Sequence, residues 1–321
     1  NQGATRRGSY ASYMDISHPE ITEFIDMRKP AGGDINRKNL NLHHGVVVSD
    51  KFMKAMENDE SWNLIDPNSK AKIKTVKARQ LWIKILEARV TTGEPYIMFG
   101  DTVQRDLPKT QKDLGLQVTH SNLCSEITLA TNTERTAVCC LSSVNVEKFD
   151  EWKDNKLFID DLMRMLDNVL THFIDVAPSH LWRAIASAKS ERSIGLGAMG
   201  FHTYLQSKNV PIESDEAMSW NQTIFKHIHT KALATNYILG KKRGEPSDMK
   251  GTGKRFAHMI AIAPNASSSI ICGGVSPSIE PFRANAFTQK TLSGSALMKN
   301  PNLEKLLKEK GINNKQTWQS I

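Results

Sequence analysis

Helical stretches alternate with short apolar runs along the chain, and this alternation limits the folds open to it. Apolar residues at helical spacing predict helices at 76–92, 158–176 and 214–239, the last one stopped by Gly240. Short apolar runs predict strands at 96–99, 123–129, 137–146, 194–199 and 259–263. Alternating helices and strands favour an α/β fold with a mainly parallel sheet. An open doubly wound sheet and a closed barrel both fit this pattern.

Composition and charge narrow the class of protein. Of the 321 residues, 39% are hydrophobic, enough for one large α/β domain or two ordinary ones. No apolar run reaches the roughly 20 residues of a membrane span, and no signal-peptide pattern opens the chain, so we expect a cytoplasmic protein. Asn1 and Ile321 both read as positions inside a longer chain, so we expect 1–321 to be a partial domain.

The net charge of +8 favours anionic partners such as nucleotides or an acidic protein surface. The basic residues are spread out and form no stripe with aromatic residues, so a nucleic-acid groove is not expected. Four cysteines are too few for a disulfide scaffold. The sequence contains no C-x-x-C motif, so a zinc site is not expected. His43 and His44 are adjacent and should diverge on a strand. No metal site is therefore expected.

The first candidate site is the segment Ser121-Asn122-Leu123-Cys124-Ser125-Glu126. If this segment is extended, Asn122, Cys124 and Glu126 share one face. A carboxylate can act as a base, an amide can orient a polar substrate, and a thiol can serve as nucleophile or radical carrier. The structural alternative is a buried cysteine on a half-exposed strand.

The second candidate is the pair Cys139 and Cys140. Adjacent residues of a strand face opposite sides, so only one of the two can share a site with Cys124. The other is expected to pack in the core as a small hydrophobic residue.

The third candidate runs from Ile260 to Ile270. An apolar strand leads through Pro264 into a turn and then a serine-rich stretch that should open a helix. Backbone N–H groups and hydroxyls at a helix N-terminus can bind phosphate, and a plain serine N-cap is the structural alternative. The serine-rich stretch is Ser267-Ser268-Ser269, which follows Ala266.

The segment from Gly195 to Gly200 matches the dinucleotide fingerprint G-x-G-x-x-G. Its context is wrong for an NAD site, because the preceding residues 188–193 are polar and no βαβ unit opens there. We expect tight glycine packing beside a helix that begins at Phe201.

Taken together, these motifs resemble the large (alpha) subunit of class I ribonucleotide reductases. The resemblance rests on segments 121–127, 137–145, 195–200, 263–270 and 278–281, and on residues 2–8 (Gln-Gly-Ala-Thr-Arg-Arg-Gly). It implies reduction of ribonucleoside diphosphates to deoxyribonucleotides by thiyl-radical chemistry, for DNA synthesis. The implied fold is a ten-stranded α/β barrel, here incomplete, with the radical cysteine on a central finger loop.

The resemblance also implies roles for single residues. Cys124 would be the thiyl radical that removes hydrogen from C3′ of the ribose, Glu126 would take the 3′-hydroxyl proton, and Asn122 would bind the sugar. Cys139 would be one member of the redox pair, which thioredoxin or glutaredoxin reduces. The segment from Ala266 to Ser269 would hold the substrate phosphates.

Further roles implied by the resemblance concern regulation and partners. Gln2, Gly3 and Arg6 would belong to the loop that couples a nucleoside triphosphate effector to substrate choice. The metal-radical cofactor would reside in a partner small (beta) subunit. The remaining segments of the large subunit and a second large subunit are further expected partners, and the expected location is the cytoplasm, or the host cytoplasm if a phage encodes the chain.

The sequence also departs from the family pattern. No second redox cysteine precedes Cys124, no paired tyrosines relay the radical, and Cys272 matches no catalytic position. Three alternatives therefore stay open: a non-catalytic nucleotide-binding remnant, a reductase that depends on adenosylcobalamin, and an NAD-dependent dehydrogenase.

Overall fold

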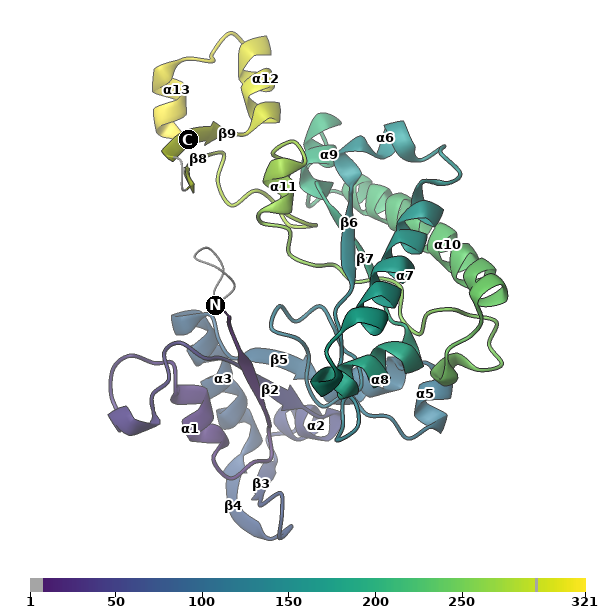
Figure 1. Ribbon diagram of the computed structural model, residues 1–321. Coiled ribbons are helices and arrows are strands. Elements are labelled where there is room, and N and C mark those ends of the chain that lie inside the picture. The colour runs from purple at the N-terminus through teal and green to yellow at the C-terminus, as the bar shows by residue number, and fades with distance from the viewer. Residues whose placement is uncertain (1–7, 292–293) are drawn as a thin grey trace. The chain divides into compact units, whose positions relative to one another are not determined.

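The computed structural model describes residues 8–291 and 294–321, and the chain divides into two compact units, Asn1–Ala137 and Val138–Ile321 (Figure 1). The effector-loop residues Gln2, Gly3 and Arg6 lie outside the described residues. No helix within the described ranges is long and apolar enough to cross a membrane.

The first unit is built on a parallel sheet in the order β1-β2-β5. Its apolar core contains Ile16, Val46, Phe52, Leu64 and Ile85. An antiparallel hairpin, β3-β4, and five α-helices complete it. The elements are β1 (Ala11–Asp15), α1 (Ile21–Asp26), η1 (Ile35–Arg37), β2 (His43–Val48), α2 (Asp50–Glu57), β3 (Ser61–Ile65), β4 (Lys72–Lys77), α3 (Ala78–Thr92), β5 (Tyr96–Phe99), α4 (Gly100–Asp106) and α5 (Lys109–Asp113).

The second unit holds a parallel pair, β6-β7, and an antiparallel hairpin, β8-β9. Leu196 of β7 also forms an isolated parallel bridge with Ile260. The elements are β6 (Leu141–Asn145), η2 (Val146–Lys148), α6 (Phe149–Trp152), α7 (Phe158–Val176), η3 (Ser179–Leu181), α8 (Trp182–Glu191), β7 (Gly195–Met199), α9 (Phe201–Ser207), α10 (Asp215–Arg243), η4 (Ser247–Met249), α11 (Ser268–Ile271), β8 (Ala286–Thr291), β9 (Gly294–Lys299), α12 (Pro301–Glu309) and α13 (Lys315–Ser320).

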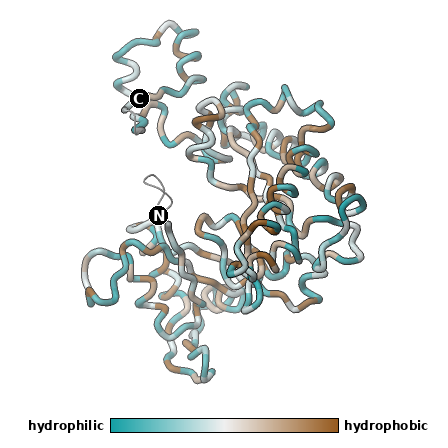
Figure 2. Tube along the Cα trace, in the orientation of Figure 1, coloured by the Kyte–Doolittle hydropathy of each residue, from teal (hydrophilic) through white to brown (hydrophobic). Residues whose placement is uncertain are grey.

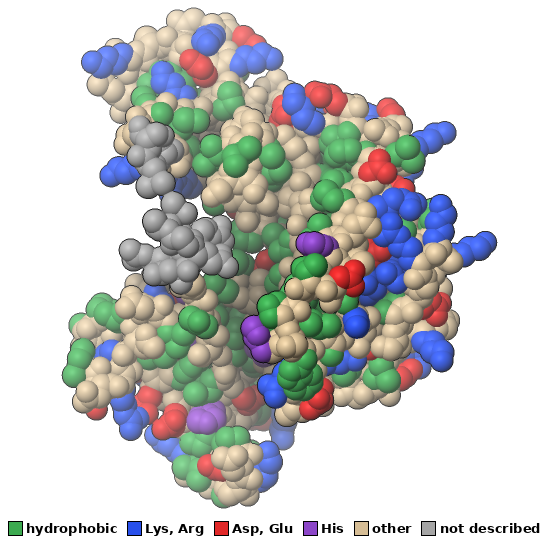
Figure 3. All heavy atoms as spheres, viewed as in Figure 1, with side chains coloured by type: hydrophobic (Ala, Val, Ile, Leu, Met, Phe, Trp, Pro, Cys, Tyr) green, Lys and Arg blue, Asp and Glu red, His purple; other side chains and the backbone are tan. Residues whose placement is uncertain are grey.

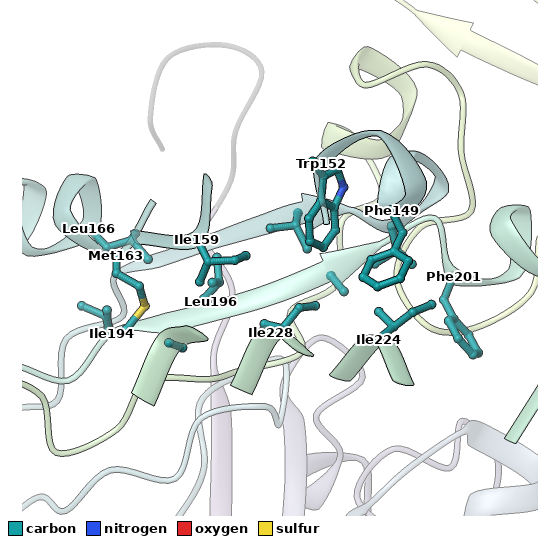
Figure 4. Close-up of a cluster of buried hydrophobic side chains, with 14 of the residues drawn as sticks. Phe149, Trp152, Ile159, Met163, Leu166, Ile194, Leu196, Phe201, Ile224 and Ile228 are labelled. Carbon is teal, nitrogen blue, oxygen red and sulfur yellow. The ribbon is translucent and has the colours of Figure 1, made fainter. Parts of the chain in front are cut away.

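The core of the second unit lies where α7 and α10 pack on the β6-β7 pair. Met163 and Leu166 of α7, Leu196 of β7 and Ile224 and Ile228 of α10 point toward one another in Figure 4. Apolar and polar residues alternate along the helices in Figure 2, as amphipathic helices require. Lys and Arg side chains gather over the outer face of α10 in Figure 3.

Most of the predicted helices and strands are present, and the parallel strand pairing is confirmed. The helix at 158–176 and the strands at 96–99 and 195–199 match closely. The predicted helix at 76–92 begins at Ala78, after strand β4. No sheet among the described residues closes into a barrel.

Gly240 does not stop α10, which continues to Arg243. A Cβ at Gly240 would lie 2.1 Å from the carbonyl oxygen of Gly253. Glycine at position 240 therefore allows the backbone at Gly253 to approach the helix closely. The prediction took this glycine for a helix stop because it lies near the end of the helix.

Three predicted strands are wrong in whole or in part. Residues 123–129 form no strand, 137–146 pair only over Leu141–Asn145, and 259–263 contribute a single bridge through Ile260. An apolar run shows that a segment is buried, but strand pairing depends on a partner from elsewhere in the chain.

A buried carboxylate joins the helices of the second unit. Asp167 of α7 is fully buried, and its carboxylate contacts Arg192, Arg243 and Arg255 at 2.7, 2.6 and 3.2 Å. Burial alone would raise the pKa of Asp167, but the three guanidinium groups outweigh it and hold the pKa below its ordinary value of 3.8. One ionised carboxylate thus neutralises part of the charge of three arginines from different parts of the unit.

We predict that Asp167→Asn lowers the free energy of unfolding by about 3 kcal/mol or more, because it leaves three guanidinium groups without their counter-charge. Urea denaturation of the two proteins measures the difference. Asp175→Asn, an exposed change on the same helix, is the matched control and should change stability by less than about 0.5 kcal/mol. A small loss at Asp167 would contradict the role given to this residue.

The interaction of Asp167 with the three arginines also predicts how the stability of the protein changes with pH. Because the pKa of Asp167 is lower in the folded state than in the unfolded state, its stabilisation is complete above the ordinary carboxyl pKa and is lost as pH falls through the folded value. The difference in unfolding free energy between wild type and Asp167→Asn should therefore shrink in acid below about pH 4. A difference that grows in acid would contradict this assignment.

Candidate functional site

The segment from Ser121 to Ile127 forms a tight turn and not the predicted extended strand. The N–H of Ser125 donates to the carbonyl of Asn122 at 3.1 Å, and Ser125 has a positive φ of 72°. The amide of Asn122 closes the turn, since its Oδ1 accepts the N–H of Ile127 at 3.0 Å and its Nδ2 donates to Glu126 Oε2 at 2.7 Å. Asn122 and Glu126 are thus brought together as predicted, but by a turn and not by strand alternation.

Cys124 lies at the tip of this turn and is exposed. Partial burial raises the pKa of its thiol, and the carboxylate of Glu126 raises it further. At neutral pH the sulfur therefore carries its hydrogen. A nucleophilic cysteine needs the opposite shift, toward the thiolate, whereas removal of a hydrogen atom needs S–H.

Two tyrosines lie on the sheet beside this turn, and the sequence reasoning singled out neither. Tyr13 of β1 and Tyr96 of β5 are both in register with Gly45 of the central strand β2. The hydroxyl of Tyr13 hydrogen-bonds to Ser121, 108 residues further along the chain. No local pattern marks a contact across that separation, and of the two tyrosines only Tyr96 lies on a strand that the sequence predicted.

A second polar cluster in this unit surrounds the buried Glu94. Its carboxylate contacts His43, His44 and Arg28, the last at 3.5 Å. The expectation that the two histidines diverge is wrong, because both reach this one carboxylate. Burial lowers the pKa of His44 in spite of its contact with Glu94, so this fully buried imidazole is neutral at neutral pH. No cluster of three or more metal-ligating side chains occurs in the ranges that the structure describes.

In the second unit, the serine-rich segment follows the predicted order of a turn and then a helix. Asn265, nine-tenths buried, donates its side-chain amide to the carbonyl of Ala263 across Pro264 at 2.7 Å. The helix α11 is short, and Ser267 at its N-cap makes no capping hydrogen bond through its side chain.

The backbone N–H groups of Ala266, Ser267 and Ser268 have no hydrogen-bond partner among the described residues. Beside them lies a cavity of about 450 Å³, lined in part by Ser267, Ser269, Arg283 and Lys299. Unpaired N–H groups, hydroxyls and two cations are suited to bind an anion, and the carboxylate of Glu280 in the same lining opposes it.

Cys139 and Cys140 face opposite sides, as predicted. Cys140 is buried in the core, its thiol lies 3.4 Å from the carbonyl of Leu166, and burial raises the pKa of this thiol to about 11. Cys139 is exposed. Of the pair, only Cys139 is therefore accessible for chemistry.

Residues 195–199 of the glycine-rich segment form the fully buried strand β7, and Gly200 is the N-cap of α9. A Cβ at Gly197 would lie 2.3 Å from the carbonyl oxygen of Ala261, and one at Gly195 would lie 2.8 Å from the Ala261 side chain. The prediction of tight glycine packing is confirmed, but the partner is the segment that leads to Ala266 and not the helix α9. This packing positions the segment from Ala261 to Ala266.

A family model described as "Ribonucleotide reductase, barrel domain" matches residues 1–251 and 246–321. These two ranges together cover the whole chain. The chain belongs to the ribonucleotide reductase large-subunit family.

The relatives bear this out. A putative ribonucleoside-diphosphate reductase large subunit from Frog virus 3 is 50% identical over 323 residues, covering 100% of this chain and 57% of the relative. The large subunit from Invertebrate iridescent virus 3 is 46% identical, covering 100% of this chain and 60% of the relative. The chain spans less than two thirds of the length of these relatives.

A solved structure supports the same fold. The alpha subunit of the class Id ribonucleotide reductase from Actinobacillus ureae superposes with a TM-score of 0.84 at 38% identity, covering 98% of this chain and 55% of that chain. The α/β barrel class is therefore the fold of this family. The NAD-dehydrogenase alternative has no support in these matches.

We predict that Gly197→Ala destabilises the protein by about 1–3 kcal/mol, because the added methyl group meets a backbone carbonyl that cannot move out of its way. Urea denaturation measures the loss. Gly8→Ala, where an added methyl group meets nothing within 4 Å, is the control. Equal stability of Gly197→Ala and wild type would contradict the close approach to Ala261.

We also predict that Glu126→Gln speeds alkylation of Cys124 by iodoacetamide at fixed, mildly alkaline pH. The carboxylate raises the pKa of the thiol, so its neutral replacement lowers that pKa and increases the thiolate fraction, which is the reactive form. Mass spectrometry of the Cys124 peptide measures the rate. Glu134→Gln, an exposed change in the following loop, should leave it unchanged, and slower alkylation in Glu126→Gln would contradict the electrostatic assignment.

Proposed function

We propose that this chain is the catalytic domain of an enzyme that reduces ribonucleoside diphosphates to 2′-deoxyribonucleoside diphosphates by thiyl-radical chemistry. The observation that carries the proposal is the turn in which the amide of Asn122 binds the carboxylate of Glu126 at 2.7 Å with Cys124 between them. The raised pKa of the thiol keeps the S–H bond that a radical carrier needs.

Each of the three side chains of the turn has a separate role in the first steps of the proposed reaction. The sulfur radical of Cys124 takes the hydrogen atom from C3′ of the ribose, and Glu126 takes the proton of the 3′-hydroxyl. Asn122 hydrogen-bonds the reacting sugar and holds the carboxylate in place. The 2′-hydroxyl then leaves as water with a proton from one thiol of the redox pair, and C2′ receives the hydrogen of the other thiol as the pair closes to a disulfide. The hydrogen atom on Cys124 returns to C3′ at the end, which regenerates the sulfur radical.

The reduction needs two electrons, which a pair of thiols supplies by forming a disulfide. The exposed Cys139 is the proposed member of this pair on the chain. No cysteine precedes Cys124 in the sequence. The proposal places the second thiol of the pair on a part of the large subunit other than 1–321. Thioredoxin or glutaredoxin would return the disulfide to the dithiol.

The cavity beside α11 is the proposed site for the substrate phosphates. The N–H groups of Ala266, Ser267 and Ser268 would donate to phosphate oxygens, assisted by the hydroxyl of Ser269. Pro264 and Asn265 hold the turn that presents them.

Several finer features belong to the same proposal. The complete domain would be a ten-stranded α/β barrel with the Cys124 turn as its central finger loop. Gln2, Gly3 and Arg6 would read a bound nucleoside triphosphate effector. A small subunit would supply the radical from its metal cofactor, two large subunits would pair, and the viral relatives favour the host cytoplasm as the place of action.

We predict that Cys124→Ser abolishes deoxyribonucleotide formation while nucleotide binding is retained, because serine cannot form the radical under conditions that oxidise a thiol. The measurement is product formation by the complete large subunit with its small subunit. Cys272→Ser, at an exposed position outside the proposed machinery, should keep its turnover.

The outcomes separate the open alternatives. Turnover in Cys124→Ser would overturn the radical assignment. Activity that depends on added adenosylcobalamin and not on the small subunit would favour the cobalamin class. No product from wild type, with nucleotide still bound, would favour a non-catalytic remnant.

A further inference from the structure

Tyr13 connects the sheet of the first unit to the thiol turn. Its ring lies directly over Gly45 of β2, where a Cβ would come within 2.4 Å of the ring carbon Cε1. Only glycine at position 45 leaves room for the ring in this place. The ring is therefore fixed by the sheet, and its hydroxyl reaches the residues that frame the Cys124 turn.

The hydrogen bonds beyond the hydroxyl lead into the turn itself. Tyr13 Oη hydrogen-bonds to Ser121 Oγ, and Ser121 Oγ donates to the carbonyl of Asn122 at 3.1 Å. The serine hydroxyl has one hydrogen, so in this arrangement the tyrosine donates to the serine. The same Asn122 carbonyl accepts the N–H of Ser125, which closes the turn around Cys124.

The protonation state of the phenol agrees with this direction of donation. Burial raises the pKa of Tyr13, and the neighbouring hydroxyls of Ser121 and Ser125 only partly offset that effect, so the phenol keeps its hydrogen. Ser121 is itself buried, so water does not readily replace the tyrosine there.

We propose that Tyr13 is a positioning residue that holds the Cys124 turn closed from the neighbouring sheet through Ser121. Hydrogen bonds of Asn122 to Glu126 and Ile127 stabilise the turn from within, and the hydrogen bond from Tyr13 to Ser121 stabilises it from the sheet. The role in catalysis rests on the proposed function, since a hydrogen-atom transfer from the ribose requires the sulfur at a fixed place.

Tyr96 is the control residue for removal of the Tyr13 hydroxyl. It sits in register with Gly45 on the other side, and its pKa is raised by burial and by the nearby charges of Glu94, Tyr13 and Cys124. Its hydroxyl makes no hydrogen bond to any residue that the structure describes. Tyr96→Phe therefore removes a nearby phenol hydroxyl without removing a hydrogen bond to the Cys124 turn.

The test is peptide-resolved alkylation of the cysteines by iodoacetamide at one mildly alkaline pH, in Tyr13→Phe, Tyr96→Phe and wild type. In Tyr13→Phe the loosened turn removes the partial burial that raises the pKa of the thiol, so alkylation of Cys124 should accelerate about threefold. The exposed Cys139 and Cys272 report on the rest of the chain and should react at wild-type rates. Tyr96→Phe should match wild type at all three positions.

Gly45→Ala gives the same test by another route, since the added methyl group pushes the Tyr13 ring from its place. With circular dichroism confirming a folded sheet, Cys124 should again react faster. An unchanged Cys124 rate in Tyr13→Phe, or equal acceleration at all three cysteines, would overturn the positioning role.

Turnover of the complete enzyme separates this inference from the proposed function. Tyr13→Phe should lower kcat for the nucleoside diphosphate by about tenfold or more with KM unchanged, because the substrate phosphates bind elsewhere. A raised KM with unchanged kcat would contradict the positioning role. The alkylation result needs no turnover, so it holds or fails even if wild type makes no deoxyribonucleotide.

Discussion

The ion cluster around Asp167 is the interaction on which the second unit depends. Arg192 follows α8 and leads into β7, Arg243 ends α10, and Arg255 begins the path toward the anion-binding segment. One buried carboxylate therefore fixes three chain segments at once. Removing these charges from water is costly, and the cluster is stable only because each guanidinium finds the same carboxylate and further oxygen acceptors.

The path from Arg255 to Ala266 shows how this constraint reaches the candidate site. Asn236 of α10 accepts the N–H groups of Arg255 and Phe256, both at 2.8 Å, and the chain then runs along β7 with Leu196 donating to the carbonyl of Met259. The glycines of β7 permit that contact because they carry no side chain. The N–H groups that would meet phosphate are thus placed by helices and glycines distant from them in sequence.

In the first unit, the geometry around the Cys124 thiol depends on whether the backbone N–H of Ile127 binds a neighbouring strand or the side chain of Asn122. The residues around Cys124 are compatible with a strand, but the amide of Asn122 satisfies the backbone N–H of Ile127 and the carboxylate of Glu126 together. Asparagine is well suited to such local turns because its short side chain imitates the backbone. The turn concentrates thiol, amide and carboxylate more tightly than an extended strand would.

The sequence by itself determined the helix-strand alternation, the parallel pairing, the family and the grouping of Asn122, Cys124 and Glu126, because these depend on local periodicity and on motifs that are contiguous in the chain. Only the tertiary structure decided that residues 121–127 turn, that Gly197 approaches Ala261, and that Tyr13 reaches Ser121. The last two are contacts between segments far apart in sequence, and the first is a choice between two local structures that the periodicity of the sequence does not distinguish. The physical reason is that periodicity reports which face of a segment is buried, whereas the partner that buries it is set by packing of the whole unit.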